Sequence, residues 1–357
     1  MISKFTLLLI LMSSVWATRT VFAQQLPMLS EYTHNAGLIN PAMTGWENIT
    51  AITAGYRHQW TGMNQAPRTA SLGFRGFMDD KNMGIGGHIM HDQTGPTSYT
   101  GLNFMYAYHL KFKPEISGTA NRNRLSIGLS LSALQYRLRG EDLLVNDLDD
   151  QLLVGTNRSR ILPDAGMGIF YYNDLFYMGF SVPQMISMKV RFEDVNGLSN
   201  IRRTAHFYVN AGAKIEINNQ YKSLEEEDEE IGRATTKKIK TDKQQRKHYI
   251  IPSFWIKYAP TSPLNINFNV RYMWDQVFGI GLGYTTDGTL IGDFDVNIAK
   301  HMRLGYAFSI GVNGLSQHLG TNHEISLTYI FKSNGKGWLF PEVGNKKREK
   351  KVKDPAK

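Results

Sequence analysis

Long stretches of the chain alternate between apolar and polar residues, the pattern typical of β-strands. Every second residue is apolar between Arg124 and Ala133, between Ala205 and Ile217, and between Leu264 and Tyr272. Each of these runs covers nine or more residues. Strands of soluble proteins usually have about 5–6 residues, whereas strands that cross a membrane need about 9–11. The pattern therefore indicates membrane-crossing strands.

Fourteen such strands are predicted along the chain. Their expected ranges are 49–60, 68–78, 83–93, 97–112, 122–137, 163–173, 175–183, 203–217, 248–259, 263–274, 276–286, 289–299, 302–312 and 322–331. A single-chain bacterial barrel has an even number of strands, which places both ends on the same side of the membrane. The sequence therefore predicts an all-β fold, a transmembrane antiparallel β-barrel of the bacterial outer membrane over residues 49–331.

The expected links between strands differ in length from one end of the barrel to the other. Links at 79–82, 274–276 and 299–301 are short and follow even-numbered strands, whereas those at 138–162, 184–202 and 313–321 are longer and follow odd-numbered strands. Because periplasmic turns are short and outer loops long, we expect both termini to be periplasmic.

Aromatic residues gather near the expected strand ends, as a membrane girdle requires. The pairs are Tyr56 with Trp60, Tyr106 with Tyr108, Trp255 with Tyr258, Tyr272 with Trp274, and Tyr329 with Phe331. A soluble β-sandwich core is the alternative interpretation of these aromatic residues.

Residues 1–23 have the features of a secretory signal peptide. Lys4 supplies the positive start, residues 5–12 form an apolar run, and Val21-Phe22-Ala23 is a small-x-small cleavage pattern. The apolar run is too short for a transmembrane helix. Cleavage would leave residues 24–48 as an N-terminal non-strand segment, which either plugs the lumen or packs at the periplasmic rim.

Composition narrows the candidate chemistry. The chain contains no cysteine, which excludes disulfides, thiolate metal sites and cysteine nucleophiles. His88 and His91 would point to opposite faces of a strand, so no metal and no other cofactor is expected. No residues form an ordered acid–base set, and we expect no catalytic residues and no enzymatic activity. Three basic residues, Arg124, Lys214 and Arg271, are expected to point into the lumen.

The net charge of +9 is concentrated in one part of the chain. Residues 332–357 hold nine basic and three acidic residues and are predicted to form a basic C-terminal periplasmic tail. Candidate partner-docking residues in this tail are Trp338, Phe340, Lys346, Lys347, Arg348, Lys350 and Lys351. An acidic partner, peptidoglycan or anionic lipid headgroups would suit them, and a solvated tail is the alternative.

A second charged segment interrupts the barrel at 218–247, where an acidic block precedes a basic block. Such blocks are usually solvated, and a partner-binding arm is the alternative. Because the rest of the exported chain is nearly neutral, no nucleic-acid partner is expected.

Two short segments of the mature chain carry a family resemblance. The first contains Asn40, Pro41, Ala42 and Gly45. The second contains Tyr56, Arg57, Gln59 and Trp60, followed by Pro67 and Arg68. In this order the two segments resemble the signature of the PorP/SprF family of type IX secretion system membrane proteins, and the likeness extends over about residues 25–331.

The resemblance implies an outer-membrane barrel of Bacteroidota that works in type IX protein secretion and, in some members, in gliding motility. It implies either periplasmic ring lipoproteins of the secretion system or a surface cargo adhesin as partners, besides outer-membrane lipids. It implies no catalytic residues. A porin or small-solute transporter is the alternative suggested by the polar lumen faces, and a membrane hydrolase is the least favoured class.

The first signature segment also has a local interpretation. Pro41 fixes its own φ angle and biases Asn40 towards extended geometry. Gly45 can turn the chain before the first strand. Arg57 and Gln59 share one face of that strand, and with Arg68 they either brace the N-terminal segment or line the lumen.

Overall fold

The computed structural model describes residues 36–112, 123–140, 157–187, 189–191, 200–202, 204–217, 248–260, 262–275, 277–313 and 317–333. Its strands are β1 (Ile49–His58), β2 (Arg68–Met78), β3 (Met83–Thr94), β4 (Thr97–Lys111), β5 (Arg124–Arg139), β6 (Asn157–Tyr172), β7 (Phe176–Gln184), β8 (Lys189–Arg191), β9 (Asn200–Arg202), β10 (His206–Ala213), β11 (Ile215–Ile217), β12 (His248–Ala259), β13 (Ser262–Trp274), β14 (Phe278–Thr285), β15 (Thr289–Ala299), β16 (Met302–Gly311) and β17 (Thr321–Ser333). Three short helices accompany them: α2 (Ala36–Ile39), η2 (Pro41–Met43) and η3 (Asp79–Lys81).

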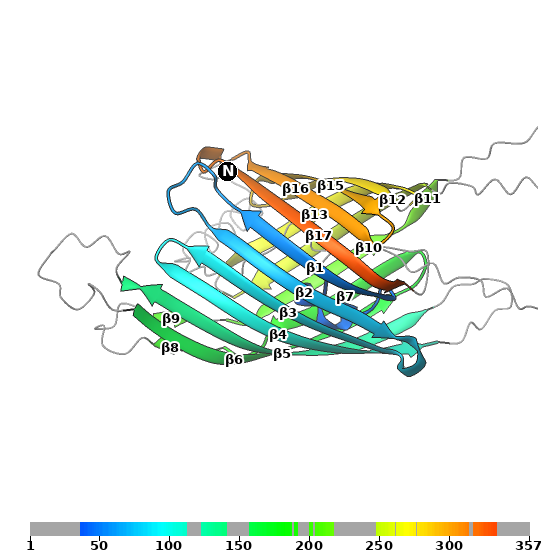
Figure 1. Ribbon diagram of the computed structural model, residues 1–357, viewed down its shortest axis with the longest axis horizontal. Coiled ribbons are helices and arrows are strands. Elements are labelled where there is room, and N and C mark those ends of the chain that lie inside the picture. Colours follow the sequence, from blue (N-terminus) through cyan, green and yellow to red (C-terminus); the bar gives the residue numbers. More distant parts are fainter. Residues whose placement is uncertain are drawn as a thin grey trace, which may run out of the picture.

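The main sheet closes on itself as an antiparallel barrel (Figure 1). Neighbours in sequence pair with one another, β1 pairs with β17, and β10 pairs with both β7 and β12. β10 and β11 are two parts of one wall strand interrupted at Lys214, so the barrel has fourteen strands. The prediction of a fourteen-stranded outer-membrane barrel is confirmed.

Most strand boundaries lie within three residues of those expected from the sequence. The ranges 68–78, 248–259 and 289–299 are reproduced without change. The largest difference is in β6, which begins at Asn157 because residues 157–162 also pair with β5. Two further short strands, β8 and β9, pair with each other within the long link predicted at 184–202.

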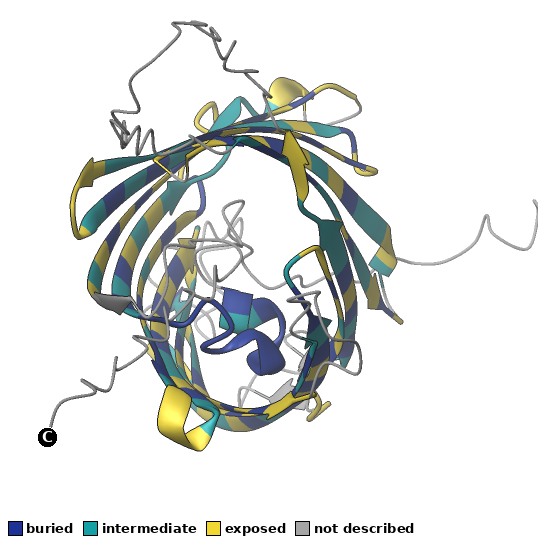
Figure 2. Ribbon diagram, turned by 90° about the vertical axis from the view of Figure 1, so that its right-hand side faces the viewer, coloured by how far each residue is buried: buried dark blue, intermediate teal, exposed yellow. Residues whose placement is uncertain are grey.

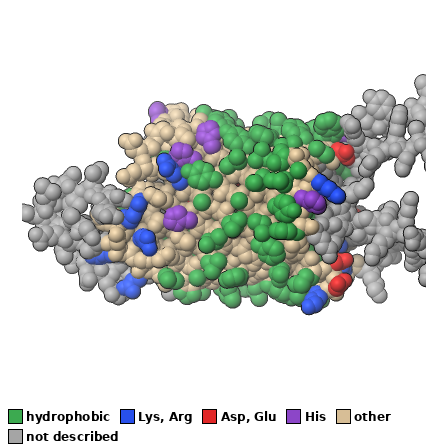
Figure 3. All heavy atoms as spheres, in the orientation of Figure 1, with side chains coloured by type: hydrophobic (Ala, Val, Ile, Leu, Met, Phe, Trp, Pro, Cys, Tyr) green, Lys and Arg blue, Asp and Glu red, His purple; other side chains and the backbone are tan. Residues whose placement is uncertain are grey.

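The wall has an apolar outer face and a polar inner face. On β5, Leu131 is 68% exposed while its neighbour Ser130 is only 5% exposed, because successive side chains of a strand point to opposite faces. On the face shown in Figure 3, apolar side chains form a broad band over the middle and right-hand part of the outer surface. This band is the hydrophobic surface that a barrel presents to lipid.

One aromatic residue departs from the predicted girdle. Trp255 is 3% exposed and faces inward, where its ring lies edge-on to that of Tyr208 at 5.4 Å. Its partner in the predicted pair, Tyr258, is 46% exposed on the outer face. The prediction was wrong for Trp255 because the two residues are three positions apart, and such a spacing places them on opposite faces of a strand.

Within the described part of the chain, the helices are too short and too polar to cross a bilayer.

Candidate functional site

Residues 36–48, which we call the luminal segment, lie inside the barrel near the end where β1 begins (Figure 2). The segment contains helices α2 and η2. Every residue from Ile39 to Asn48 is buried, including the polar side chains of Asn40, Thr44 and Glu47. Such complete burial of a short, partly polar segment requires many specific contacts with the wall.

Local chemistry sets the shape of the luminal segment. Asn40 has the extended geometry expected before a proline, with φ −143° and ψ 110°. Its Oδ1 accepts a hydrogen bond from the Ala42 amide at 2.9 Å, which caps η2, and Pro41 stands at the helix start. Gly45 has φ +81° and turns the chain towards β1. The expectations for Asn40 and Gly45 are therefore confirmed.

The side chain of Asn40 also ties the segment to two wall strands. Its Nδ2 donates to the carbonyl of Ile169 on β6 at 3.1 Å and to that of Phe180 on β7 at 3.4 Å. Beside it, the Ser181 hydroxyl donates to the Ile39 carbonyl at 2.6 Å. One fully buried amide thus uses both its donor and its acceptor groups, which makes Asn40 the most connected polar residue of the segment.

Glycines on three strands let the segment approach the wall backbone closely. A Cβ atom on Gly84 would lie 1.9 Å from the Thr44 carbonyl oxygen, and one on Gly128 would lie 2.1 Å from the Ala42 nitrogen. A Cβ atom on Gly168 would lie 2.0 Å from Asn40 Oδ1. We call Gly84, Gly128 and Gly168 the glycine cradle, because any larger residue there would collide with the segment.

A histidine on β4 connects the segment to β6. His109 Nε2 lies 2.9 Å from the Thr44 carbonyl oxygen, and its Nδ1 lies 2.9 Å from the Tyr172 hydroxyl. Since a carbonyl only accepts, Nε2 carries the proton and donates to it. The neutral ring then accepts at Nδ1 from the Tyr172 hydroxyl. His109 is fully buried, and this chain of two hydrogen bonds satisfies both of its nitrogens.

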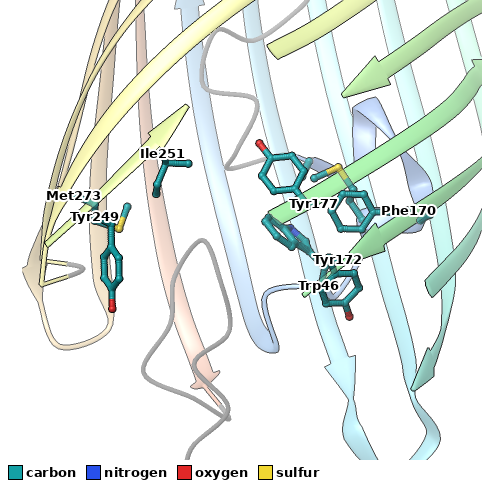
Figure 4. Close-up of a cluster of buried hydrophobic side chains, with 10 residues drawn as sticks. Trp46, Phe170, Tyr172, Tyr177, Tyr249, Ile251 and Met273 are labelled. Carbon is teal, nitrogen blue, oxygen red and sulfur yellow. The ribbon is translucent and has the colours of Figure 1, made fainter. Parts of the chain in front are cut away.

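Trp46 fastens the end of the segment through aromatic packing (Figure 4). Its ring centroid lies 5.3 Å from that of Phe170, 6.0 Å from that of Tyr172 and 5.5 Å from that of Tyr177, each in an edge arrangement. Trp46 is only 2% exposed. Burying an indole in an aromatic cluster contributes several kcal/mol, on the order of 3–5, to holding the segment in place.

Charged groups complete the attachment. The Arg75 Nε of β2 lies 2.7 Å from Glu47 Oε2, and its Nη1 donates to the Thr53 hydroxyl at 2.8 Å. Arg124 of β5 donates to Asn48 Oδ1 at 3.3 Å, so it faces the lumen as expected. Burial raises the pKa of the Glu47 carboxyl above its ordinary value, and the Arg75 guanidinium opposes that effect only in part.

The far wall of the lumen carries its own ion pairs. Arg271 of β13 contacts Asp293 and lies 2.7 Å from Asp295 Oδ1, both on β15, and Arg303 of β16 also contacts Asp295. Asn269 donates to Asp293 at 3.2 Å. All four charged side chains are buried. Arg271 therefore points into the lumen as expected and is neutralised by wall carboxylates.

The second signature segment lies at the opposite end of β1. Arg57 is 3.9 Å from Glu324 of β17, the Gln59 amide donates to the Pro67 carbonyl at 3.0 Å, and the Trp60 amide donates to Asn322 Oδ1 at 2.9 Å. These contacts close the β1–β2 loop and hold it against β17. Tyr56 and Arg68 are exposed there.

The structure therefore brings Asn40, Pro41, Ala42 and Gly45 together in one site and places the second signature segment elsewhere. Arg75, rather than Arg57 or Arg68, has the described ionic contact with the luminal segment. The sequence could have indicated this role, because Arg75 lies on the inner face of the predicted strand 68–78. The candidate docking residues of the tail and the insertion 218–247 lie outside the described residues.

The described residues offer no metal centre, since no group of three or more His, Asp or Glu among them is arranged to hold an ion. What the arrangement can do is mechanical: it fixes the N-terminal part of the chain to seven consecutive wall strands, β2 to β7 and β10.

One family of known proteins matches most of the chain. The family described as type IX secretion system membrane protein PorP/SprF matches residues 21–329. Among solved structures, the chain is similar to the toluene transporter TodX of P. putida, with 9% identity and a TM-score of 0.39 over 83% of this chain and 94% of that one. It is also similar to a KdgM porin, with 10% identity and a TM-score of 0.35 over 79% and 99%. The search of curated protein sequences found no match.

Proposed function

The chain belongs to the PorP/SprF family of type IX secretion system membrane proteins, and from this premise we propose that it is a non-enzymatic anchor in the outer membrane. Its partners are other components of the secretion system. The proposal is that it holds either the periplasmic lipoprotein ring or a surface cargo adhesin, with a link to gliding motility in the latter case. Both termini would then lie in the periplasm.

The observation that carries this proposal is the attachment of the luminal segment. Four of the family-signature residues, Asn40, Pro41, Ala42 and Gly45, lie in a segment held by hydrogen bonds, aromatic packing and the glycine cradle. A segment attached at this many points is a fixed internal support and differs from a loop that moves aside for a solute. A rigid barrel with an anchored N-terminal region suits a scaffold on which other proteins assemble.

The deletion of residues 25–45 tests whether the segment matters for secretion. We expect the barrel to assemble but cargo to accumulate in the periplasm, because the scaffold loses its internal support. Barrel assembly is checked by heat-modifiable mobility on gels, and cargo is measured in the culture medium and on the cell surface. Intact secretion by an assembled barrel would reject a functional role of the segment.

The charged parts of the chain outside the described residues are proposed as docking elements for the partners. Recovery of type IX components from solubilised outer membranes would be compared among the full chain, a variant lacking 218–247 and a variant lacking 334–357. We expect at least one deletion to reduce the recovery of one partner. Equal recovery of every partner from all three would reject the docking role.

A porin remains the second candidate, since the inner wall carries buried polar and charged side chains on many of its strands. The wall of β13 to β16 supports it, because Arg271 and Arg303 pair with the carboxylates of Asp293 and Asp295 in the same wall. Single-channel recordings in planar bilayers decide between the two functions. A stable open conductance from the full-length protein favours the porin, and silent membranes that contain folded barrel favour the anchor.

A further inference from the structure

A continuous row of polar residues lies on the outer surface at the end of the barrel opposite the luminal segment. Strand register makes the following residues successive neighbours across β17 and β1 to β6: His323, His58, Arg68, Gln93, Ser98, Arg137 and Ser159. We call this set the outer polar row. Directly opposed residues have Cβ atoms about 5 Å apart, so the row forms an unbroken band.

The outer polar row faces outward, in phase with the apolar residues that form the lipid-facing band. Arg68 lies on the same face of β2 as Leu72 and Phe74, which are 50% and 38% exposed. Arg137 lies on the same face of β5 as Leu129 and Leu131, which are 56% and 68% exposed. These side chains therefore project from the wall into the surroundings of the barrel rather than into its lumen.

The position of the row relative to the apolar band is set by the same register. The next row along the strands contains Tyr56, Ala70, His91, Thr100 and Gln135, and the row after it is Leu327, Ala54, Leu72, Ile89 and Leu102. Successive rows are about 7 Å apart. The outer polar row thus lies beyond the apolar rows, towards the strand ends, and runs obliquely because the strands are tilted; Figure 3 shows basic and histidine side chains at this edge of the band.

The chemistry of the row is that of an anion receptor. It has two arginines, two histidines and three neutral polar residues, and it has no carboxylate. Arg68 and Arg137 are both exposed. Within the part of the chain that the structure describes, neither arginine forms an ion pair. The described residues therefore leave the charge of both guanidinium groups uncompensated.

The opposite edge of the band differs. There, Lys111 lies 2.9 Å from Asp79 Oδ1, and Asp80 and Lys81 stand beside them. Lys111 thus has a carboxylate partner on the protein surface, whereas Arg68 and Arg137 have none among the described residues.

We propose that the outer polar row binds the phosphate groups of a phosphorylated glycolipid in the outer leaflet of the outer membrane. Guanidinium groups pair with phosphate oxygens in a bidentate manner, and the serine and glutamine side chains donate to the remaining oxygens of the sugar headgroup. The acyl chains continue from there over the apolar rows. Placing this edge in the outer leaflet rests on the proposed function, because it requires periplasmic termini.

The test measures how much bisphosphorylated lipid A the purified full-length barrel retains in detergent micelles that contain this lipid. The test variant is Arg68→Gln with Arg137→Gln, and the matched control is Lys81→Gln with Lys111→Gln, which removes two positive charges from the opposite edge. We expect the test variant to retain about tenfold less lipid A than the wild type, and the control to retain the wild-type amount.

Two further arms identify what is bound. The first arm uses lipid A from which both phosphates have been removed. The wild type should retain this lipid only as weakly as the test variant retains bisphosphorylated lipid A. Inorganic phosphate at comparable phosphorus concentration should displace little lipid, because it lacks the acyl chains that contact the apolar rows. Complete displacement by inorganic phosphate would reassign the row to a free-anion site and overturn the lipid proposal.

Equal retention by the wild type and the test variant, or by both lipid forms, would also overturn it. Heat-modifiable mobility confirms that each variant is folded. Failure of lipid binding is distinguishable from failure of the proposed function, because secretion and partner recovery are measured separately in cells.

Discussion

The two halves of the barrel wall satisfy their inner polar surface in different ways. Strands β2 to β7 are covered by the luminal segment, which supplies hydrogen bonds, an indole and a carboxylate from the same chain. Strands β13 to β16 use pairs of oppositely charged wall residues, Arg271 and Arg303 with Asp293 and Asp295. The first half depends on shape and small residues, and the second depends on charge balance. Substitutions should therefore have separable effects on docking of the segment and on stability of the wall.

The largest effect is expected for Gly128→Val. The new side chain would enter the space of Pro41 and Ala42, so the luminal segment cannot dock, at a cost of more than about 4 kcal/mol. Because the chain has no cysteine, Met43→Cys provides a unique label that is protected in the docked state. Its rate of reaction with a maleimide reagent should rise to that of Met63→Cys, which is at an exposed position.

Gly292→Val is the matched control, since a Cβ there has nothing within 4 Å. Protection of the label in the Gly128→Val protein would show that the glycine cradle does not determine docking.

A smaller effect, confined to the other half, is expected for Arg271→Leu. Removing this guanidinium leaves Asp293 without an ionic partner and Asp295 with Arg303 alone, which should lower the free energy of unfolding by about 3 kcal/mol. Urea titration of the barrel in lipid vesicles measures this loss. Labelling of Met43→Cys should stay slow, and Lys300→Leu, in an exposed turn, should leave both measurements unchanged. Fast labelling would show that the two halves are coupled.

Asn40→Ala should weaken docking by about 2 kcal/mol, because two wall carbonyls and the Ala42 amide lose their partner. The labelling rate of Met43→Cys should increase accordingly while the urea midpoint changes little. Asn265→Ala removes an exposed hydrogen bond to Asp287 in the other half and should have no measurable effect on labelling. An equal effect of both substitutions would remove the special role assigned to Asn40.

The smallest effect is expected for Glu47→Gln, with a change of about 1 kcal/mol or less in docking. Burial raises the pKa of the Glu47 carboxyl, so the docked segment binds a proton more readily than the free segment does. Docking should therefore strengthen as the pH falls through the raised pKa of Glu47 in the docked state. This gain should be complete below the ordinary pKa of a glutamate carboxyl, about 4.3. Glu47→Gln should make docking independent of pH in that range.

Labelling of Met43→Cys relative to Met63→Cys at each pH measures this effect and cancels the pH dependence of the thiol reaction. Docking that weakens on acidification would mean that the Arg75 ion pair, rather than burial, controls the carboxyl.

Much of the wall was predictable because the signal is local. Alternation with period two gave the strand ranges and their inward and outward faces, as in β13, where Arg271 points in and Val270 points out. Proline and glycine geometry likewise predicted the extended Asn40 and the turn at Gly45. The errors arose at two places. Trp255 lies on the inner face of its strand although it was predicted in the outer girdle, and β6 begins earlier than predicted because it pairs with β5 over a greater length.

By itself, then, the sequence determined that the chain forms a barrel with an apolar exterior, because lipid imposes the same alternation on every strand. Only the tertiary structure showed which residues of the interior contact the luminal segment and which residues lie together near the strand ends. Gly84, Gly128 and Gly168 are unremarkable glycines in the sequence, and they become a cradle because register aligns them beneath one segment. Arg68 and Arg137 are 69 positions apart in the chain, and the outer polar row joins them because antiparallel pairing across four strands places them in one register row.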